Sequence, residues 1–258
     1  MKQTALILGA SGAVGKAAIN ALAEKGYDFY LVHRDRRVAA DALEIFINEI
    51  RANGSRVVSF NANINEEKTQ TEVIEKIKSD SARISIFVHA IADGNVGKAF
   101  SRGKRNLDIH SYIHTFTSMA ASFAVWTQLL ANNDLLVNDS RVIGLTSEGS
   151  YKVLDDYMAV GMAKAALEAA CRYMAVELAP TGIRVNLINA GIIDTPALRV
   201  FEGHQQLIDR AVKRNPSGRI TTPQDIAKII SFLASSDSAW ITGEIIRADG
   251  GEQLMPFS

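Results

Sequence analysis

Short apolar runs alternate with longer helical patterns along nearly the whole chain of 258 residues. The runs are continuously apolar, which is typical of strands that are buried on both faces. Strands separated by helices predict a parallel sheet that is covered on both sides. We therefore expect one α/β domain over residues 1–258, a doubly wound Rossmann fold whose mostly parallel seven-stranded sheet has helices on both faces.

The apolar runs predict strands over Thr4–Leu8, Phe29–His33, Arg56–Asn61, Ile84–Ala90, Ser140–Leu145, Arg184–Asn189 and Ile245–Ala248. Helices are expected between them, over Gly15–Lys25, Val38–Asn53, Glu66–Ser79, His110–Ala131, Asp155–Leu178 and Pro223–Ser235. Ligands of such sheets bind beyond the carboxyl ends of the strands. The segments that follow the strands are therefore the ones to inspect for function.

Charge and composition exclude several classes of function. Lys and Arg together number 28, as do Asp and Glu, whereas binding to a nucleic acid or an anionic membrane would need a basic surplus. The single cysteine, Cys171, lies among alanines, so we expect a buried thiol and a reducing cytoplasm. No apolar run approaches the roughly 18 residues of a membrane helix. The histidines show no metal-ligand spacing, and no metal site is expected.

A glycine-rich segment, G9-A-S-G12-A-V-G15, follows the first strand and opens a helix. Glycine lets the backbone turn sharply and approach a pyrophosphate, which the free N–H groups of the helix start then bind. Tight strand-to-helix turns also need glycine for steric reasons alone. The place of this segment in the first strand–helix unit favours a dinucleotide site.

The end of the second strand indicates which dinucleotide is preferred. An acidic residue there would bind both ribose hydroxyls of NAD, but His33 and Arg34 come first in this chain. A guanidinium suits a 2′-phosphate through its charge and its forked hydrogen bonds, and Ser11 offers a hydroxyl to the same phosphate. NADPH is therefore favoured. Asp35 keeps NADH open, and a solvated basic loop is the remaining interpretation.

Tyr157 and Lys164 are seven residues apart in Y157-M-A-V-G-M-A-K164. Two helical turns span about 7.2 residues, so a helix places both side chains on one face. A phenol held beside an ammonium can give or share its proton with a substrate oxygen. The same spacing occurs in many ordinary helices, so the pair gains its meaning from the glycine turn and from the order of the elements.

With these features and the terminal D249-G-G251, the chain resembles the short-chain dehydrogenase/reductase family over essentially its whole length. The stretch that runs from Y157-M-A-V-G-M-A-K to G182-I-R-V-N-L-I-N-A-G-I-I-D-T is similar to the divergent branch that holds bacterial enoyl-acyl-carrier-protein reductases. The segment F87-V-H-A-I-A92 resembles the same branch, and the overall pattern is most similar to its NADPH-type enoyl reductase III.

The resemblance implies a role for particular residues. Tyr157 is the expected catalytic acid, and Lys164 is expected to bind the nicotinamide ribose and to lower the pKa of that tyrosine. Ser147 is the candidate for the family's catalytic serine. The further residues that the resemblance assigns to cofactor binding are Gly9, Ser11 and Gly15 at the phosphates, Asn63 at the adenine, Ala90 and Ile91 along the cofactor, and Ile193 and Thr195 at the carboxamide.

Two departures from the family pattern bear on the reaction. The serine lies only 10 residues before the tyrosine, so the connecting loop is shortened, as in the enoyl reductases, and Ser118 stands where typical members have a proton-relaying asparagine. Reduction of an enoyl thioester needs one donor to its developing enolate, which Tyr157 supplies. We therefore rank an NADPH-dependent enoyl-thioester reductase first. The alternatives are a carbonyl reductase or alcohol dehydrogenase of the same family, and a non-catalytic dinucleotide-binding module.

The long mixed segment at about residues 195–219 is expected to fold over the substrate, an acyl thioester or other small carbonyl compound, as a mobile lid. Phe201 and Leu207 within it are candidates to face an acyl chain. Asp155 and Asp156 are expected to cap the following helix. Small residues along that helix predict a close helix contact, which in this family usually belongs to a homotetramer.

Overall fold

The computed structural model describes residues 2–102, 106–196, 198–200 and 203–255. Within them the strands form one parallel sheet in the order β3-β2-β1-β4-β5-β6-β7, which confirms the predicted doubly wound fold. Their bounds are β1 Thr4–Leu8, β2 Asp28–His33, β3 Val57–Asn61, β4 Ile84–His89, β5 Leu136–Thr146, β6 Arg184–Ala190 and β7 Ile245–Ala248. Leu8 stands opposite both Val32 and His89, so β1, β2 and β4 end at one level.

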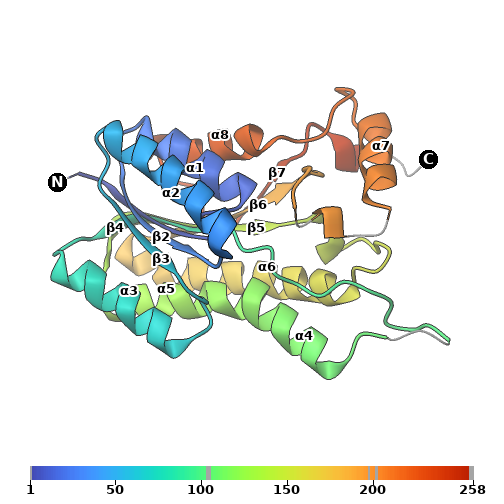
Figure 1. Cartoon of the computed structure of the whole chain (residues 1–258), viewed down its shortest axis with the longest axis horizontal. Helices are drawn as coiled ribbons and strands as arrows, with labels where there is room; N and C mark the ends of the chain where they lie inside the picture. Colours follow the sequence, from blue (N-terminus) through green and yellow to red (C-terminus); the bar gives the residue numbers. More distant parts are fainter. Residues whose placement is uncertain (1, 103–105, 197, 201–202, 256–258) are drawn as a thin grey trace.

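Helices cover both faces of the sheet (Figure 1). One face carries α1 (Ala13–Ala23), α2 (Arg37–Ala52) and α8 (Pro223–Leu233), and the other carries α3 (Glu67–Ser79), α4 (Ile109–Phe116), α5 (Ser122–Asn132) and α6 (Met158–Leu178). The remaining helix, α7 (His204–Arg214), stands beyond the carboxyl ends of the strands. Among the described residues, no helix is both long and apolar enough to cross a membrane.

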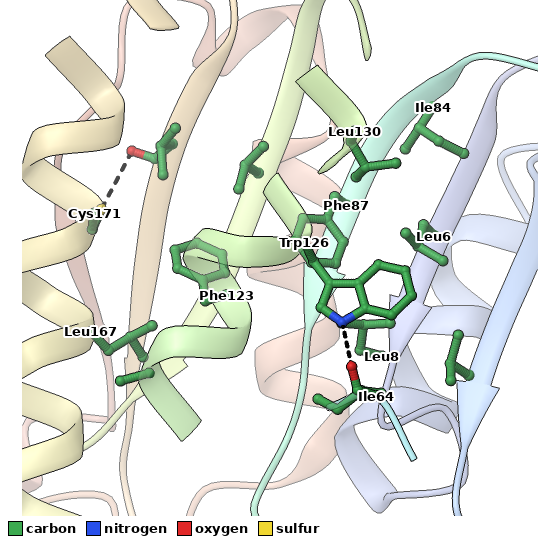
Figure 2. Close-up of a cluster of buried hydrophobic side chains, with 14 of the residues drawn as sticks. Leu6, Leu8, Ile64, Ile84, Phe87, Phe123, Trp126, Leu130, Leu167 and Cys171 are labelled. Carbon is green, nitrogen blue, oxygen red and sulfur yellow. Dashed lines mark hydrogen bonds between the residues drawn. The ribbon is translucent and has the colours of Figure 1, made fainter. Parts of the chain in front are cut away.

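The core between the sheet and α5 is built around Trp126, which is completely buried (Figure 2). Its indole N–H donates a hydrogen bond of 3.0 Å to the backbone oxygen of Ile64. Cys171 packs in the same layer, 3.6 Å from the backbone oxygen of Val185, and burial raises the pKa of its thiol to about 12. The prediction that this cysteine is buried packing is confirmed, because a thiol of such a pKa stays protonated.

The helix predicted over residues 110–131 is not continuous. A π-helical turn, Thr117–Ala121, separates α4 from α5. Ser122 begins α5, and its hydroxyl donates to the backbone oxygen of Ser118 at 2.8 Å, which occupies one of the carbonyls of the widened turn. The apolar pattern is nearly the same for both kinds of helix, so the sequence alone did not indicate the interruption.

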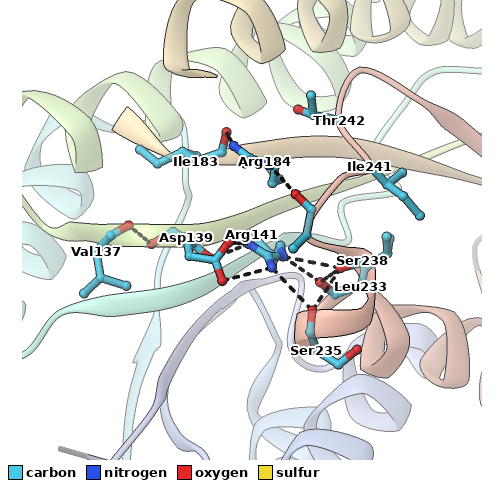
Figure 3. Close-up of polar contacts among 12 residues, drawn as sticks. Val137, Asp139, Arg141, Ile183, Arg184, Leu233, Ser235, Ser238, Ile241 and Thr242 are labelled. Atoms are coloured by element: carbon cyan, nitrogen blue, oxygen red, sulfur yellow. Dashed lines mark hydrogen bonds and ion pairs between the residues drawn. The ribbon is translucent and has the colours of Figure 1, made fainter. Parts of the chain in front are cut away.

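Strand β5 begins at Leu136, four residues before the predicted start, and its pairing with β4 shifts register between Ile84 and Ile86. Polar residues near its start hid this extension. Arg141 within it is buried, and its guanidinium reaches the end of α8 (Figure 3). It donates to the backbone oxygen of Leu233 at 3.0 Å and pairs with Asp139 at 2.6 Å. These bonds satisfy a buried cation and tie the sheet to α8.

Candidate active site

The turn between β1 and α1 is shaped by glycines that no other residue could replace. Gly9 has a φ of +82°, and a Cβ added there would lie 2.3 Å from the backbone oxygen of Ala90. A Cβ on Gly15 would lie equally close, 2.3 Å, to the backbone oxygen of Gly9. Helix α1 starts at Ala13, two residues earlier than predicted, and its N-cap, Gly12, has no side chain to cover the helix N–H groups. This cradle fits a pyrophosphate.

Arg34, predicted to bind a 2′-phosphate, already has an anionic partner. Its Nη2 atom lies 3.0 Å from Oδ2 of Asp93, in the segment that follows β4. The other oxygen of Asp93 lies 3.3 Å from Nε2 of His114 on α4. Since β1 lies between β2 and β4, the Arg34–Asp93 pair spans the carboxyl end of β1, where the glycine turn stands. A 2′-phosphate would therefore compete with Asp93 for this guanidinium.

The side chains next to Arg34, at the ends of β2 and β3, are held by one another. His33 is buried, and its Nδ1 atom lies 2.7 Å from Oδ2 of Asp35. The backbone N–H of Asp35 donates to Oδ1 of Asn61 at 2.9 Å. Asn63 accepts a hydrogen bond of 3.1 Å from the backbone N–H of Asn65, so its amide oxygen keeps one lone pair for an adenine amino group. Asp35 is thus oriented by His33 and β3.

The structure brings Ser147 and Tyr157 together, as the sequence predicts. Their hydroxyl oxygens are 3.3 Å apart. Tyr157 is the N-cap of α6 rather than a residue inside the helix, with φ −108° and ψ 5°. A Cβ on Gly149 would lie 2.5 Å from two carbons of the tyrosine ring, so this glycine lets the ring lie against the loop backbone. Ser11, by contrast, lies in the glycine turn, near the expected phosphates.

The predicted lowering of the Tyr157 pKa is wrong for the free protein. Burial raises the pKa of this phenol, the charge of Glu148 adds to the increase, and the hydrogen bond with Ser147 opposes it. The phenol is therefore held protonated, which suits a proton donor. Lys164 is buried, and burial lowers the pKa of its ammonium to about 8, against the opposing charge of Glu168. Its Nζ atom donates to the backbone oxygen of Leu145 at 2.6 Å, and its contact with Tyr157 stays a prediction.

His89, in the segment that resembles the enoyl reductases, is a neutral structural residue. Its Nε2 atom lies 2.7 Å from the hydroxyl oxygen of Ser122. That hydroxyl donates to Ser118, so it accepts from His89 and the proton of the ring lies on Nε2. Burial, together with the charge of Lys164, lowers the pKa of His89 to about 3. The histidine therefore braces the π-helical turn and is not a titrating acid or base.

A cavity of about 990 Å³ opens in front of Tyr157 at the carboxyl ends of β4, β5 and β6. Ile193 and Thr195, predicted to hold the carboxamide, line it, and so does Leu207 of α7. That residues 195–219 form a mobile lid over the substrate stays a prediction, and Phe201 lies outside the described residues. Further side chains on the wall are Val96, Met119, Val153, Leu154, Leu198, Arg210, Lys213 and Arg214.

Sequence reasoning missed a cluster of charges in the wall of this cavity. Nη2 of Arg214 lies 2.7 Å from Oε1 of Glu148 and 2.6 Å from Oε1 of Glu252. The partners are 66 and 38 residues away along the chain, so no spacing rule could have joined them. The weak signal that was available is positional, because Glu148 directly follows the candidate Ser147.

One smaller prediction near Tyr157 is wrong. Asp155 and Asp156 do not cap α6, since the helix starts at Met158, and both lie near Lys98, whose Nζ is 4.0 and 3.1 Å from their carboxylates. Tyr151 donates its hydroxyl to Gln253 and so packs the loop against the C-terminal segment. Within the described residues, no three His, Cys, Asp or Glu side chains are arranged to hold a metal ion.

Comparison with known proteins agrees with this geometry. A 1-cyclohexenylcarbonyl-CoA reductase of Streptomyces collinus is 29% identical over 264 residues, which cover 99% of this chain and 89% of that protein. A cyclohexanol dehydrogenase of Rhodococcus sp. (strain TK6) is 28% identical, with 96% and 95% covered. The crystal structure of enoyl-acyl-carrier-protein reductase (NADH) from Aquifex aeolicus VF5 matches with a TM-score of 0.82 at 24% identity, covering 98% and 97% of the two chains.

The family model described as enoyl-(acyl carrier protein) reductase matches residues 9–253, which span the glycine turn, the Ser147–Tyr157 pair and the wall of the cavity. This chain therefore belongs to the short-chain dehydrogenase/reductase family of oxidoreductases, in its enoyl-acyl-carrier-protein-reductase-like branch.

Proposed function

We propose that the protein is an NADPH-dependent reductase of enoyl thioesters. The cavity in front of Tyr157 is the observation that carries the proposal. Apolar side chains form much of its wall, which suits an acyl chain, and the cation Lys213 of α7 lies along the same wall. A phosphorylated acyl carrier would find its complement in that cation. The similarity to a 1-cyclohexenylcarbonyl-CoA reductase supports the same class of substrate.

The residues of the chain fit a nicotinamide dinucleotide. The pyrophosphate would lie in the cradle formed by Gly9, Gly15 and the start of α1, where the backbone packs too closely to admit a Cβ. The turn with Ile193 and Thr195 would hold the carboxamide, and buried Lys164 would face the ribose. When bound, the reduced dinucleotide supplies a hydride to the β-carbon of the substrate.

Tyr157 performs the complementary step. As charge develops on the thioester oxygen, the phenolic O–H donates a hydrogen bond to it and stabilises the enolate. The raised pKa keeps this donor protonated in the free protein. Ser147 orients the phenol across the 3.3 Å contact between their hydroxyls. The surrounding apolar side chains exclude water, which strengthens the hydrogen bond to the developing anion.

We further propose that NADPH is preferred over NADH. The support is Arg34, whose guanidinium stands at the end of β2 and is more than half exposed. Exchange of its partner from Asp93 to a 2′-phosphate would replace one charge-assisted hydrogen bond by another. Asp35 is occupied by His33, which leaves its carboxylate less suited to the ribose hydroxyls that would identify NADH.

A second candidate is reduction of a carbonyl or oxidation of an alcohol. One observation favours it: the short loop does not separate Ser147 from Tyr157, so the serine–tyrosine pair of carbonyl chemistry is present. The similarity to a cyclohexanol dehydrogenase points the same way. Against it stands Ser118, which is buried and whose hydroxyl is bound by Asn65 at 3.0 Å, in the place where typical members relay protons.

One experiment separates the candidates. Purified protein is given NADPH, and in parallel NADH, with crotonyl and acetoacetyl thioesters of coenzyme A and of an acyl carrier protein. Oxidation of NADPH with crotonyl thioesters alone supports the proposal, and oxidation with acetoacetyl thioesters alone supports the carbonyl reductase. Cofactor binding without turnover of either would favour a non-catalytic module. A Tyr157→Phe preparation shows that any turnover depends on this site.

We also propose that the chain forms a homotetramer in a reducing cytoplasm. The support for assembly is a set of exposed apolar side chains on two neighbouring helices, namely Ile109, Ile113 and Phe116 of α4 and Met158, Met162, Tyr173 and Val176 of α6. The buried free thiol of Cys171 fits the compartment. Light scattering on the intact protein and on Met162→Lys tests the assembly, because a buried lysine would shift the mass toward monomer.

A further inference from the structure

The C-terminal end of α7 carries a guanidinium that two carboxylates share at the cavity wall. The side chains of Arg214, Glu148 and Glu252 are 10%, 10% and 1% exposed. Lys152 binds the second oxygen of Glu148 at 3.0 Å, so two cations face two anions. Buried charges stay ionised at acceptable cost only when they are paired in this way. The cluster also joins three segments that are distant in the chain.

We propose that Arg214 is a positioning residue for the reaction. It binds one carboxylate on each side, and it thereby fixes the Ser147–Tyr157 pair relative to the turn that would hold the cofactor's carboxamide. The inference rests on the proposed function for the chemistry that it serves. Its contacts, however, are made by residues of this chain alone, and part of its test needs no turnover.

The first arm of the cluster leads to the catalytic hydroxyls. Glu148 is joined to Ser147 by one peptide bond, and Ser147 contacts the phenol of Tyr157. The backbone oxygen of Glu148 also accepts the N–H of Lys152 at 2.8 Å. Both the backbone and the carboxylate of Glu148 are therefore fixed, and loss of the anchor at this carboxylate would leave the neighbouring serine held by fewer contacts.

The second arm leads to the nicotinamide side. Oε2 of Glu252 accepts the backbone N–H of Ile192 at 3.3 Å, and Ile192 directly precedes Ile193. The carboxylate packs so tightly against this turn that a Cβ on Gly191 would lie 2.8 Å from Oε2. Glu252 thus braces the turn from behind, and its other oxygen belongs to Arg214.

The guanidinium holds both carboxylates through one nitrogen. Its Nη2 atom lies 2.7 Å from one carboxylate and 2.6 Å from the other, and the two N–H bonds of this nitrogen lie in the guanidinium plane, which sets the directions of both contacts. Arg210, one turn earlier on α7, also lines the cavity but is exposed. It supplies a matched control, because Arg210→Gln removes the same charge from the same helix without touching the cluster.

The test compares Arg214→Gln, Arg214→Lys and Arg210→Gln with the unchanged protein. The substrate is the thioester that the unchanged protein reduces. Misplacement of catalytic groups by about 1 Å can cost up to about 100-fold in rate. We expect Arg214→Gln to lose about 10- to 100-fold in kcat, with a smaller change in KM, and Arg214→Lys to recover part of that loss. Arg210→Gln should lose less than about threefold in kcat, as expected for a residue that touches only the cavity wall.

A second measurement follows the Glu252 arm without turnover. Titration of each variant with NADPH, monitored by quenching of tryptophan fluorescence, gives the Kd for the cofactor. Arg214→Gln should weaken binding about three- to tenfold, since the carboxamide turn loses its brace, whereas Arg210→Gln should not. If the protein reduced no thioester at all, the proposed function would fail while this binding result still decided the role of Arg214.

Thermal unfolding accompanies both measurements. If Arg214→Gln does not fold, the decision passes to Arg214→Lys: a lowered kcat in a folded Arg214→Lys supports positioning, and a normal kcat with only a lower Tm overturns it. A folded Arg214→Gln with normal kcat and normal Kd would also overturn the proposal. Equal kcat losses in Arg214→Gln and Arg210→Gln would show that only the charge of α7 matters, which overturns it as well.

Discussion

The proposed cofactor side and the proposed substrate side of this site are built by different physical means. On the cofactor side, backbone atoms make the walls: Gly9 and Gly15 let the backbone segments of the turn pack closely because they have no side chains. On the substrate side, the wall is held by buried charges that come from distant segments and meet at Arg214. The first side is therefore sensitive to added volume, and the second is sensitive to lost charge.

The largest expected effect is on kcat, and it tests whether catalysis can be changed without changing cofactor binding. Tyr157→Phe removes the donor to the enolate but leaves the cradle unchanged. Positioned proton donors contribute about 100- to 10,000-fold in rate, so we expect a loss in kcat within that range. The Kd for NADPH should stay within about twofold, because the phenol makes no part of the phosphate site. Steady-state kinetics and fluorescence titration measure the two quantities, and normal turnover by this variant would refute the role given to Tyr157.

A substitution in the glycine turn should weaken cofactor binding before it affects turnover. Gly9→Ala places a Cβ 2.3 Å from the backbone oxygen of Ala90 and forces alanine into a φ of +82°. Strain of about 1–3 kcal/mol must shift the turn, so NADPH should bind about 10- to 100-fold more weakly by calorimetry. Gly26→Ala is the matched control, since it imposes a similar φ of +81° but its Cβ would meet nothing within 4 Å. Equal losses in both variants would contradict a role for the contact with Ala90.

The proposal places Lys164 between the two sides, and the pH dependence of kcat/KM tests its role. Burial lowers the pKa of its ammonium from 10.5 to about 8. If the ammonium is the working form, kcat/KM should be level below that pH and fall about tenfold per unit above it, a limb that reports the free enzyme. Lys164→Arg should move this limb out of the measurable range, because a guanidinium stays charged. If the decrease in kcat/KM at high pH were unchanged in Lys164→Arg, it would be caused by the titration of another group.

The contribution of Lys164 to folding stability changes with pH in the opposite direction from kcat/KM. It therefore serves as the control for the pH profile of activity. The folded protein disfavours the charged lysine, so the unfolded chain binds more protons between about pH 8 and 10.5. Stability from this group therefore rises with pH across that window. A loss of activity above pH 8 without a loss of Tm would separate titration of Lys164 from unfolding.

The smallest effects concern the choice of cofactor. Arg34→Ala should weaken NADPH binding about tenfold, through loss of a charge-assisted hydrogen bond, and leave NADH unchanged. Asp93→Asn should strengthen NADPH binding about two- to fivefold, since an exposed ion pair is worth up to about 1 kcal/mol and would no longer compete for Arg34. Titration with both cofactors measures this. Stronger NADH binding in Asp93→Asn, with NADPH unaffected, would reverse the interpretation of Asp93.

The sequence predicts most of the fold and much of the cofactor side, for a common reason. Strands buried on both faces leave a continuous apolar run, and the glycine turn is read from neighbouring residues such as Gly9 and Gly15. The contact between Ser147 and Tyr157 also follows from their nearness in the chain. The family resemblance then assigned roles to these positions, and those roles stay predictions.

The remaining features depend on contacts between distant residues. The ion pair of Arg34 with Asp93 joins the ends of two strands that are neighbours of β1 but not of each other. The start of α6 at Met158, the raised pKa of Tyr157 and the cluster at Arg214 are likewise set by packing. Helix α7 is strongly polar and was predicted only as part of an irregular segment, because little of its surface is buried.

The π-helical turn at Thr117–Ala121 has a consequence for comparing and engineering this protein. Such a turn accommodates one extra residue, so every later side chain of α5 is rotated by about 100° relative to an uninterrupted helix. Converting the turn to regular α-helix without removing a residue would swing Trp126 out of its core position and Ser122 away from His89. An alignment with a regular helix therefore needs a one-residue gap here, and a grafted α5 would need to retain the turn to keep its phase.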